Sequence, residues 1–402
     1  AGTVLPNPIT VMDRDLRMPS VFKTSLAMDL KLPGGIVASI EGIYNKDLRT
    51  VLFRNANLVA PKELNVAGYP DNRMIYPNAN TDKFINPILN GKAVPNGTVI
   101  PGNGAQPGAF NVIVLENSTE GHYYSVTGSL TKSFNNGIGA RISYIKSEAK
   151  SLYEGGGDQT LSSWQAISTV NGANHPVLGY SGFVAPSRVI ASVYYRKEFI
   201  KHLGTQLTLV YDGANGRQSY TYSTDINRDG ANGDLIYVPK DASEIDFVSL
   251  TIGSGANAVT YTPKQQSDLF FRFVERDSYL RGRKGKYAER NGALTPFNGQ
   301  FDFRFQQDIF TNVGGKRNTI QFNWDVLNFG NLINKDWGVQ RSSHTSSILV
   351  PTNVSSLTPG GTTRPTFRIA TEGNTPVTHG YRDNVGFGST WSMQFGFRYI
   401  FN

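Results

Sequence analysis

Apolar and polar residues alternate with a period of two along most of this chain. From Trp391 to Phe401 every odd-numbered residue is aromatic or Met, whereas the even-numbered residues from Ser392 to Arg398 are small or polar. Because successive side chains of a β-strand point to opposite faces, this segment has one nearly aromatic face and one polar face. The pattern predicts a strand over residues 390–401.

Eight more segments have the same alternation and predict about nine long strands, each with one apolar face. Only 17% of the 402 residues are charged, and 62 are Gly or Pro, a composition that is untypical of helical bundles. The chain is also too aromatic for a disordered protein. The other segments cover residues 22–32, 36–58, 122–130, 138–144, 189–198, 206–211, 301–306 and 320–326.

The connections between these segments alternate strictly between short and long. Four are tight turns, at 33–35, 135–137, 201–204 and 311–316, and carry residues that favour turns. The four long loops cover about 59–120, 151–185, 223–297 and 330–388. An outer-membrane β-barrel has this arrangement, with short periplasmic turns and long extracellular loops.

Two fold classes fit the alternation, a soluble β-sandwich and a transmembrane barrel. Two sheets packed face to face also alternate apolar and polar residues. Here, however, Lys, Asp, Arg and Gln occupy mid-strand positions on the polar face, which suits a water-filled lumen. The apolar face is aromatic towards the strand ends, as in interfacial girdles, and no apolar run of about 18 residues predicts a membrane helix. We therefore expect an all-β, transmembrane antiparallel β-barrel.

The strand count limits how much of a barrel this chain contains. Bacterial single-chain barrels close with an even number of strands, and nine is odd. With a periplasmic C-terminus, the alternation places residues 1–20 outside the cell. The expectation is the C-terminal section of a larger barrel, with the remaining strands and any plug domain upstream and not in this chain.

One loop contains the spacing of a calcium site. Asp225, Asn227 and Asp229 alternate as oxygen ligands before Gly230, although Ile236 stands where a bidentate Glu is expected and Asp234 is the nearest substitute. A loop of Asx turns and glycines uses the same residue types. The candidate metal ligands are therefore Asp225, Asn227, Asp229 and Asp234.

Residues 268–292 have near-helical spacing of apolar residues, followed by a basic stretch. The basic end would meet lipopolysaccharide phosphates or an acidic ligand, or would be the solvated face of a packed loop. Nucleic-acid binding is not expected, because basic residues are not interleaved with aromatic ones in a recognised fold. Catalysis is not expected either, since the chain has no Cys and its five His are scattered.

The segment from Gly388 to Phe401 resembles the terminal strand of TonB-dependent outer-membrane receptors. Residues 301–305 and 323–331 resemble the penultimate hairpin of that family, and Lys335 to Gly338 continue the match. The segments that resemble its Oar-like branch, typical of Bacteroidota, are Ser39–Asp47, Asp234–Pro239 and Tyr287–Gly292.

The resemblance implies a 22-stranded barrel with an N-terminal plug in the outer membrane of a Gram-negative bacterium. Its partners would be outer-membrane lipid and lipopolysaccharide, a TonB-type energy-coupling complex acting through the missing plug, the N-terminal remainder of the barrel and a surface lipoprotein. The barrel-assembly signal would comprise Trp391, Phe395, Phe397, Tyr399 and Phe401.

The expected function is energised import of a scarce ligand, such as a peptide or glycan, through a plugged barrel. The loops at 59–120 and 223–297 are the longest and are rich in Tyr, Asn and Gly, which suits ligand capture. The alternatives are a passive porin-like or structural barrel without a plug, and a secreted β-sandwich adhesin.

Overall fold

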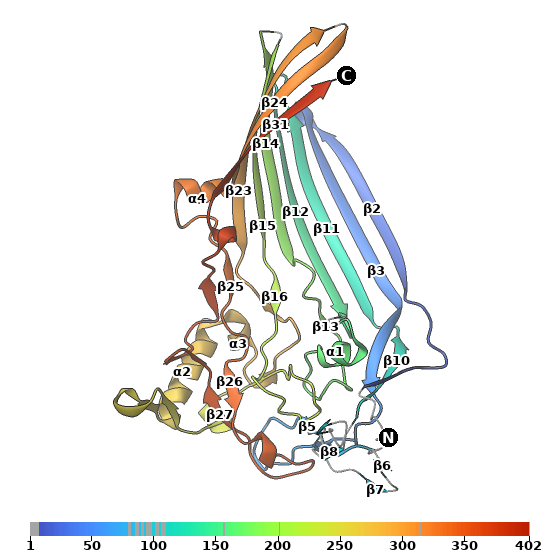
Figure 1. Ribbon diagram of the computed structural model, residues 1–402, viewed down its shortest axis with the longest axis vertical. Coiled ribbons are helices and arrows are strands. Elements are labelled where there is room, and N and C mark those ends of the chain that lie inside the picture. Colours follow the sequence, from blue (N-terminus) through green and yellow to red (C-terminus); the bar gives the residue numbers. More distant parts are fainter. Residues whose placement is uncertain are drawn as a thin grey trace.

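A single antiparallel sheet of long strands dominates the structure (Figure 1). The computed structural model describes residues 8–401 apart from 79–81, 85–87, 90–91, 94–98, 101–103, 106–109, 156, 201 and 314. The nine predicted long strands are confirmed among these residues. They are β2 (Ser20–Leu32), β3 (Ile36–Asn55), β11 (Gly121–Ser133), β12 (Ile138–Ser151), β14 (Ser187–Phe199), β15 (Leu203–Ala214), β23 (Asn298–Val313), β24 (Lys316–Leu327) and β31 (Ser392–Phe401).

The register places the predicted apolar rows on one face of this sheet. Val193 of β14 lies opposite Ala140 of β12 and Leu209 of β15. At the far end, Phe395 of β31 lies opposite Trp324 of β24. Since each pair joins residues of the same face, the nine rows form one continuous apolar face, and the alternate residues form a polar face.

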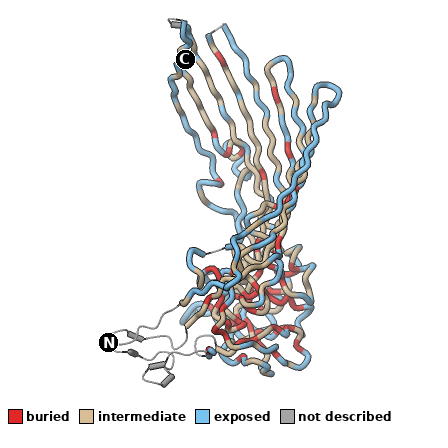
Figure 2. Tube along the Cα trace, turned by 90° about the vertical axis from the view of Figure 1, so that its right-hand side faces the viewer, coloured by how far each residue is buried: buried red, intermediate tan, exposed pale blue. Residues whose placement is uncertain are grey.

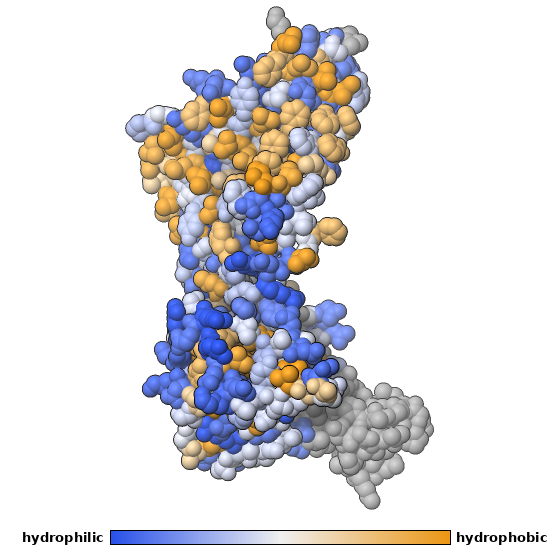
Figure 3. Space-filling view, turned by 90° about the vertical axis from the view of Figure 1, so that its left-hand side faces the viewer, coloured by the Kyte–Doolittle hydropathy of each residue, from blue (hydrophilic) through white to orange (hydrophobic). Residues whose placement is uncertain are grey.

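The apolar face is exposed, because no second sheet of the described chain covers it. Leu26 of β2 is 81% exposed and Phe397 of β31 is 78% exposed. The space-filling view has apolar side chains over the strands and mostly polar ones over the loops (Figure 3). This is not the arrangement of a β-sandwich, whose apolar faces are buried against each other.

The short and long connections lie at opposite ends of the sheet (Figure 1). Tight turns, including the 3₁₀ turn Pro33–Gly35, occupy one end, which we call the turn end. Residues 201 and 314, in two of the four predicted turns, lie outside the described residues. The long connections occupy the other end, the loop end, so the predicted segregation of the connections is confirmed for the described chain.

The loop predicted over residues 59–120 instead lies between Asn55, where β3 ends, and Val112, where a further strand begins. The interval 59–120 contains β10 (Val112–Ser118), which pairs with β3 in the register that β11 continues, since Ser118 lies opposite Thr50 and His122 opposite Lys46. β10 and β11 therefore form one long ladder on β3, interrupted only at residues 119–120. Most of residues 79–109 of this loop lie outside the described residues. Two short strands add to the sheet, β1 (Ile9–Met12) parallel to β10 and β13 (Gly179–Tyr180) on β12.

The connections at the loop end pack into a compact body, which we call the loop cluster (described residues of 56–84, 110–111, 152–186, 215–297 and 338–391). Most buried side chains of the chain lie here rather than in the sheet (Figure 2). Its main core joins residues from three loops, including Ile75, Tyr220, Phe270 and Leu349. Its helices are α1 (Thr160–Gln165), α2 (Pro263–Arg276) and α3 (Ser278–Gly282). The short helix α4 (Phe329–Ile333) lies beside β23 (Figure 1).

The long connections also contain short strand pairs. They are β4 (Lys62–Glu63) with β5 (Met74–Ile75), β6 (Ile88–Leu89) with β7 (Lys92–Ala93), β8 (Val99–Ile100) with β9 (Gly104–Ala105), β16 (Arg217–Gln218) with β22 (Ala293–Leu294), β17 (Tyr237–Val238) with β21 (Lys286–Tyr287), β19 (Leu250–Ile252) with β20 (Val259–Tyr261), β25 (Arg341–Ser343) with β30 (Tyr381–Asp383), β28 (Thr371–Glu372) with β29 (Thr375–Pro376), and β27 (Thr366–Ile369) between β18 (Asp246–Phe247) and β26 (Leu349–Pro351).

The predicted helix is confirmed as α2, but it begins and ends earlier than residues 268–292. A capping box between Thr262 and Gln265, with Pro263 in the first turn, explains its start. Phe270 and Val274 are buried in the core. The basic stretch follows the helix and is largely paired within the loop cluster, Lys284 with Glu275 for example. This pairing favours the packed-loop interpretation.

Both outer strands of the sheet have one unpaired edge. Within the described residues β2 pairs only with β3, and β31 pairs only with β24, so the sheet is open. None of the helices described in the chain combines the length and the apolar composition needed to cross a bilayer.

Candidate functional site

The polar face of the sheet carries a hydrogen-bonded network across its last strands. Arg304 of β23 forms a two-pronged pair with Asp325 of β24, with Nε–Oδ1 at 2.5 Å and Nη2–Oδ2 at 3.0 Å. On the same face the Gln321 amide donates to Asp308 at 2.9 Å. Arg304 and Asp325 therefore neutralise each other across adjacent strands of this face.

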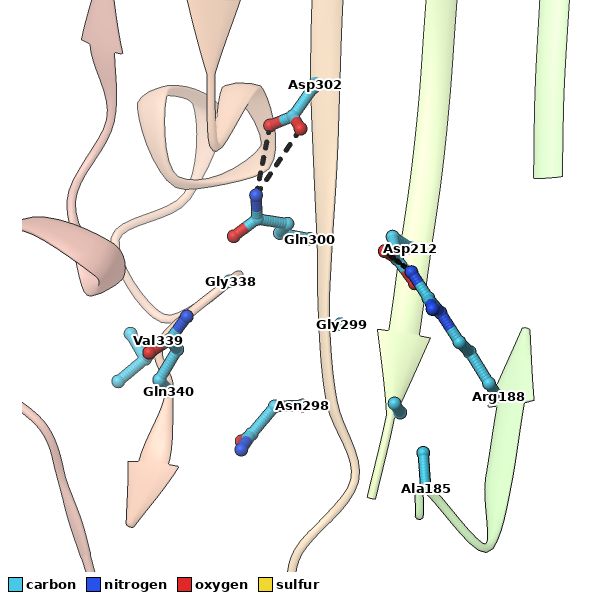
Figure 4. A pocket seen from close by; sticks show the side chains of 11 residues that line it. Ala185, Arg188, Asp212, Asn298, Gly299, Gln300, Asp302, Gly338, Val339 and Gln340 are labelled. Atoms are coloured by element: carbon cyan, nitrogen blue, oxygen red, sulfur yellow. Dashed lines mark hydrogen bonds and ion pairs between the residues drawn. The ribbon is translucent and has the colours of Figure 1, made fainter. Parts of the chain in front are cut away.

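A pocket of about 410 Å³ lies where this polar face meets the loop cluster (Figure 4). The loop-end parts of β14, β15 and β23 form one side, and the chain that follows α4 forms the other. It is lined by Ala185, Arg188, Asp212, Ala214, Asn298, Gly299, Gln300, Asp302, Gly338, Val339 and Gln340.

The charged groups of the pocket form hydrogen bonds within it, and one pair of them is neutralised. Arg188 and Asp212, on adjacent strands, form a two-pronged pair with Nε–Oδ1 at 2.9 Å and Nη2–Oδ2 at 2.6 Å. The Asp302 carboxylate accepts the backbone N–H of Asn328 at 2.8 Å and the Gln300 amide at 3.3 Å. The uncharged polar side chains of the pocket are the amides of Asn298, Gln300 and Gln340, which both donate and accept hydrogen bonds.

Asn328 fixes the wall of the pocket that comes from the 328–338 segment. Its backbone has a φ of 51°, a left-handed conformation in which Asn is tolerated better than most residues. Its side-chain amide donates to the carbonyl of Gly338 at 3.0 Å, and the Asn331 amide donates to the carbonyls of Lys335 and Trp337. These bonds close the segment into a compact loop that returns the chain to the pocket.

Replacing Gly338 with Ala is expected to open this loop. Gly338 has a φ of 64°, and an added Cβ would lie 1.8 Å from Oδ1 of Asn328. The strain and the lost amide bond together are expected to cost about 1–3 kcal/mol of local stability. Faster hydrogen exchange at the Trp337 amide measures this loss. Gly396→Ala is the matched control, because a Cβ there meets no atom within 4 Å; equal exchange in both variants would contradict the expectation.

The structure brings the four predicted calcium ligands together, but uses them to hold backbone amides. Asp225 accepts the N–H of Gly230 at 2.8 Å, and Asp234 accepts the N–H of Ile226 at 2.7 Å. Asp229 accepts the N–H of Ala173 at 2.6 Å. Asp229 also accepts the N–H of Ala231 at 2.8 Å, which is the contact of an Asx turn.

The amide of the fourth candidate, Asn227, donates to the carbonyl of Val170 at 2.8 Å. No three His, Cys, Asp or Glu side chains in the described part of the chain are grouped so that they would hold a metal ion. The calcium site stays a prediction.

Burial and mutual repulsion raise the pKa values of these carboxyl groups. Burial, reinforced by the charge of Asp225, raises the pKa of Asp229 to about 7. The pKa of Asp234 is raised well above its ordinary value by burial and by the charge of Asp229. The folded chain therefore holds protons that the unfolded chain releases.

The loop cluster is accordingly expected to lose stability as the pH rises from about 4 to about 7. Between the pKa of a carboxyl group in the unfolded chain and its higher pKa in the folded chain, only the folded chain keeps the proton. Within that range, each such group lowers the free energy of unfolding by about 1.4 kcal/mol for every unit by which the pH rises. Thermal unfolding between pH 4 and 8 measures the slope, and Asp229→Asn is expected to reduce it. If the midpoint of thermal unfolding rises with pH over this range, the protonation assignment is wrong.

The same measurement tests the predicted metal site. A higher midpoint of thermal unfolding after calcium is added at pH 7.5 would support that site.

The residues of the predicted barrel-assembly signal lie on the exposed apolar face at the edge of the sheet. Phe395, Phe397, Tyr399 and Phe401 lie on β31, and Trp391 directly precedes it. The Phe395 ring stacks on Trp324 of β24 with centroids 6.2 Å apart. Their role in assembly stays a prediction.

The pocket residues were not identified from the sequence. Arg188 and Asp212 lie near the loop ends of two adjacent predicted strands. Opposite charges at these positions are the signal that would have indicated a cross-strand pair beside the pocket. The contribution of Gly338 to Gln340 depends on the path of a long loop, for which no local pattern exists.

Comparison with known proteins leaves the family open. No family model matches the chain, and no curated protein or solved structure is similar enough to count as a match.

Proposed function

We propose that the chain forms part of the wall and the outer mouth of an outer-membrane β-barrel that imports a scarce ligand with energy from the inner membrane, as TonB-dependent transporters do. The observation that carries the proposal is one sheet with an exposed apolar face, a polar face that carries cross-strand ion pairs, and two unpaired edges. The polar face would line the lumen, and the loop cluster would stand outside the cell.

Lipid is the solvent that best suits the apolar face. Soluble monomers rarely expose contiguous apolar patches larger than a few hundred Å². Here the patch runs across nine strands, and exposing it to water costs about 25 cal/mol for each Å². The unpaired edges of β2 and β31 support further strands in the same barrel, because a sheet in lipid must satisfy its edge N–H and C=O groups.

The pocket supports a polar ligand that is not an anion. Arg188 is already paired with Asp212, so an anionic ligand would find no free cation and would meet the carboxylate of Asp302, whereas Gln300 and Gln340 offer amide groups. A peptide backbone or a glycan has the matching donors and acceptors. The position of the pocket, between the loop cluster and the polar face, suits a ligand that passes from the loops to the lumen.

Planar-bilayer recordings on the whole protein, purified from outer membranes, test the proposal against a passive porin. An importer closed by a plug is expected to give no steady conductance. The mass of its denatured chain is expected to correspond to several hundred residues more than this chain contains. A steady open current would favour the passive alternative. A protein that is released from washed membranes without detergent would refute both and favour the secreted adhesin.

A further inference from the structure

The segment that follows β24 projects sideways from the sheet at its loop end. We call residues 329–337, which contain α4, the α4 segment. In Figure 1 it stands out laterally from β23, just where the long strands give way to the loop cluster. The ring of Phe329 packs on Phe303 with centroids 5.4 Å apart. Because Phe303 belongs to the apolar face, the α4 segment is attached to that face of the sheet.

The exposed surface of the α4 segment is amphipathic. Ile333 is 64% exposed, Trp337 is 52% exposed and Leu332 is also exposed. Between them Asn334, Lys335 and Asp336 form an exposed polar tip. The side chain of Asn331 bonds the carbonyls of Lys335 and Trp337, so the loop holds its apolar groups outward in a fixed arrangement.

A second exposed apolar segment is tied to the chain that leaves the α4 segment. The N–H of Asn384 donates to the carbonyl of Gln340 at 2.7 Å, and the N–H of Gln340 donates to Oγ of Ser389 at 3.0 Å. The intervening Val385 and Phe387 are almost completely exposed. Exposed apolar groups therefore gather at one level of the molecule, at the loop end of the last hairpin.

We propose that the α4 segment is an interfacial anchor that lies in the boundary between the headgroups and the acyl chains of the outer leaflet. Leu332, Ile333 and Trp337 insert among the upper acyl chains, and the Lys335 ammonium lies among the lipid phosphates. This assignment rests on the proposed function, in which the sheet faces lipid.

The occupant is lipid rather than another protein because the surface is continuous with the apolar face through Phe329 and Phe303. An indole is amphipathic and favours the level of the headgroups, and a lysine beside an apolar surface extends its ammonium into that layer. Such segments bury their apolar side about 5–10 Å below the headgroup boundary.

Depth-dependent tryptophan quenching tests the assignment. The chain has four Trp, and Trp164 is buried in the loop cluster, where lipid labels do not reach it. W337F removes Trp337 of the α4 segment, and W324F removes Trp324 on the apolar face of the sheet. The quenching that each substitution removes is the quenching of that residue, whatever Trp the rest of the whole protein contains. Each variant of the whole protein is reconstituted into vesicles that carry a quencher either near the headgroups or near the bilayer centre.

The expected result is that the shallow label quenches Trp337 at least about twofold more than the deep label does. Trp324, which lies inside the strand, is expected to respond more to the deep label than Trp337 does. Ile333→Asp is expected to abolish the shallow quenching of Trp337, whereas Asn334→Asp, at the polar tip, leaves it unchanged. Near-ultraviolet circular dichroism confirms that each variant folds.

The two Trp reporters separate the possible failures. If lipid labels quench Trp324 but not Trp337, the interfacial anchor is wrong and the membrane proposal stands; a protein partner is then the occupant of the α4 segment. If neither reporter is quenched in the folded protein, both proposals are wrong.

Discussion

Replacing Arg73 with Met is expected to destabilise the loop cluster by about 3–5 kcal/mol. Arg73 is fully buried, and its Nε lies 3.0 Å from both carboxylate oxygens of Asp71. Its Nη2 donates to the carbonyl of Leu235 at 3.0 Å, and its guanidinium lies 4.7 Å from the ring centroid of Tyr222. The variant would leave the Asp71 carboxylate charged in the core without its cation.

Hydrogen exchange of the buried amides around Leu235 measures this loss as local unfolding. Arg382→Met is the control, because Arg382 forms an exposed ion pair with Glu372 that is worth at most about 1 kcal/mol. The double variant Asp71→Leu with Arg73→Met is expected to recover at least half of the loss, because the carboxylate that Arg73→Met leaves without its cation is then absent. Equal costs for Arg73→Met and Arg382→Met would show that the buried pair does not hold the loops together.

Replacing Val193 with Arg is expected to cost about 2–4 kcal/mol of folding free energy in vesicles. Val193 is the central residue of β14 and lies half-exposed on the apolar face. In lipid, a guanidinium at this depth loses its hydration and has no partner, so the folded and inserted state becomes less stable. Urea titration of folding in vesicles measures the difference.

Ser192→Arg is the matched control, because Ser192 is the adjacent residue on the polar face of the same strand. A new charge there would meet the lumen and is expected to change stability by at most about 1 kcal/mol. If the sheet instead faces water on both sides, Val193→Arg changes stability by no more than about 0.5 kcal/mol, as surface substitutions usually do. Similar small values for both variants would therefore remove the basis of the membrane assignment.

The long strands were predictable because their signal is local. In the segment 391–401 each residue reveals its face through its neighbours at i±2, and the same holds for residues 189–195. The turn at Asn135 to Gly137 is equally local, since its residues alone favour a tight reversal. β10 was missed because Val112–Ser118 is short and follows a long loop. Its assignment depends on its partners, Thr50 to Asn55, which lie some sixty residues earlier.

The core of the loop cluster and the pocket were not predictable in this way. Tyr220 packs with Phe273, and Tyr222 stacks on Phe367, which lies 145 residues later in the chain. No period in the sequence marks such contacts, since each loop contributes only a few apolar residues. The acidic run from Asp225 to Asp234 illustrates the same limit. Its spacing suits calcium, but Asp229 accepts an N–H from residue 173, a contact that spacing does not reveal.

The ladder of β3 with β10 and β11 has a mechanical consequence. β3 contains 20 residues and is therefore about 65 Å long, or roughly 45 Å along the membrane normal at a tilt of about 45°. This exceeds the hydrocarbon thickness of about 30 Å, so in a membrane the loop end of β3 would stand clear of the bilayer. β3 bends there, where its register with β2 shifts between Ser20 and Val21, while β10 keeps the register of β11 on its other side. Sideways force on the loop cluster would therefore reach the sheet through the ladder of β3 and β10.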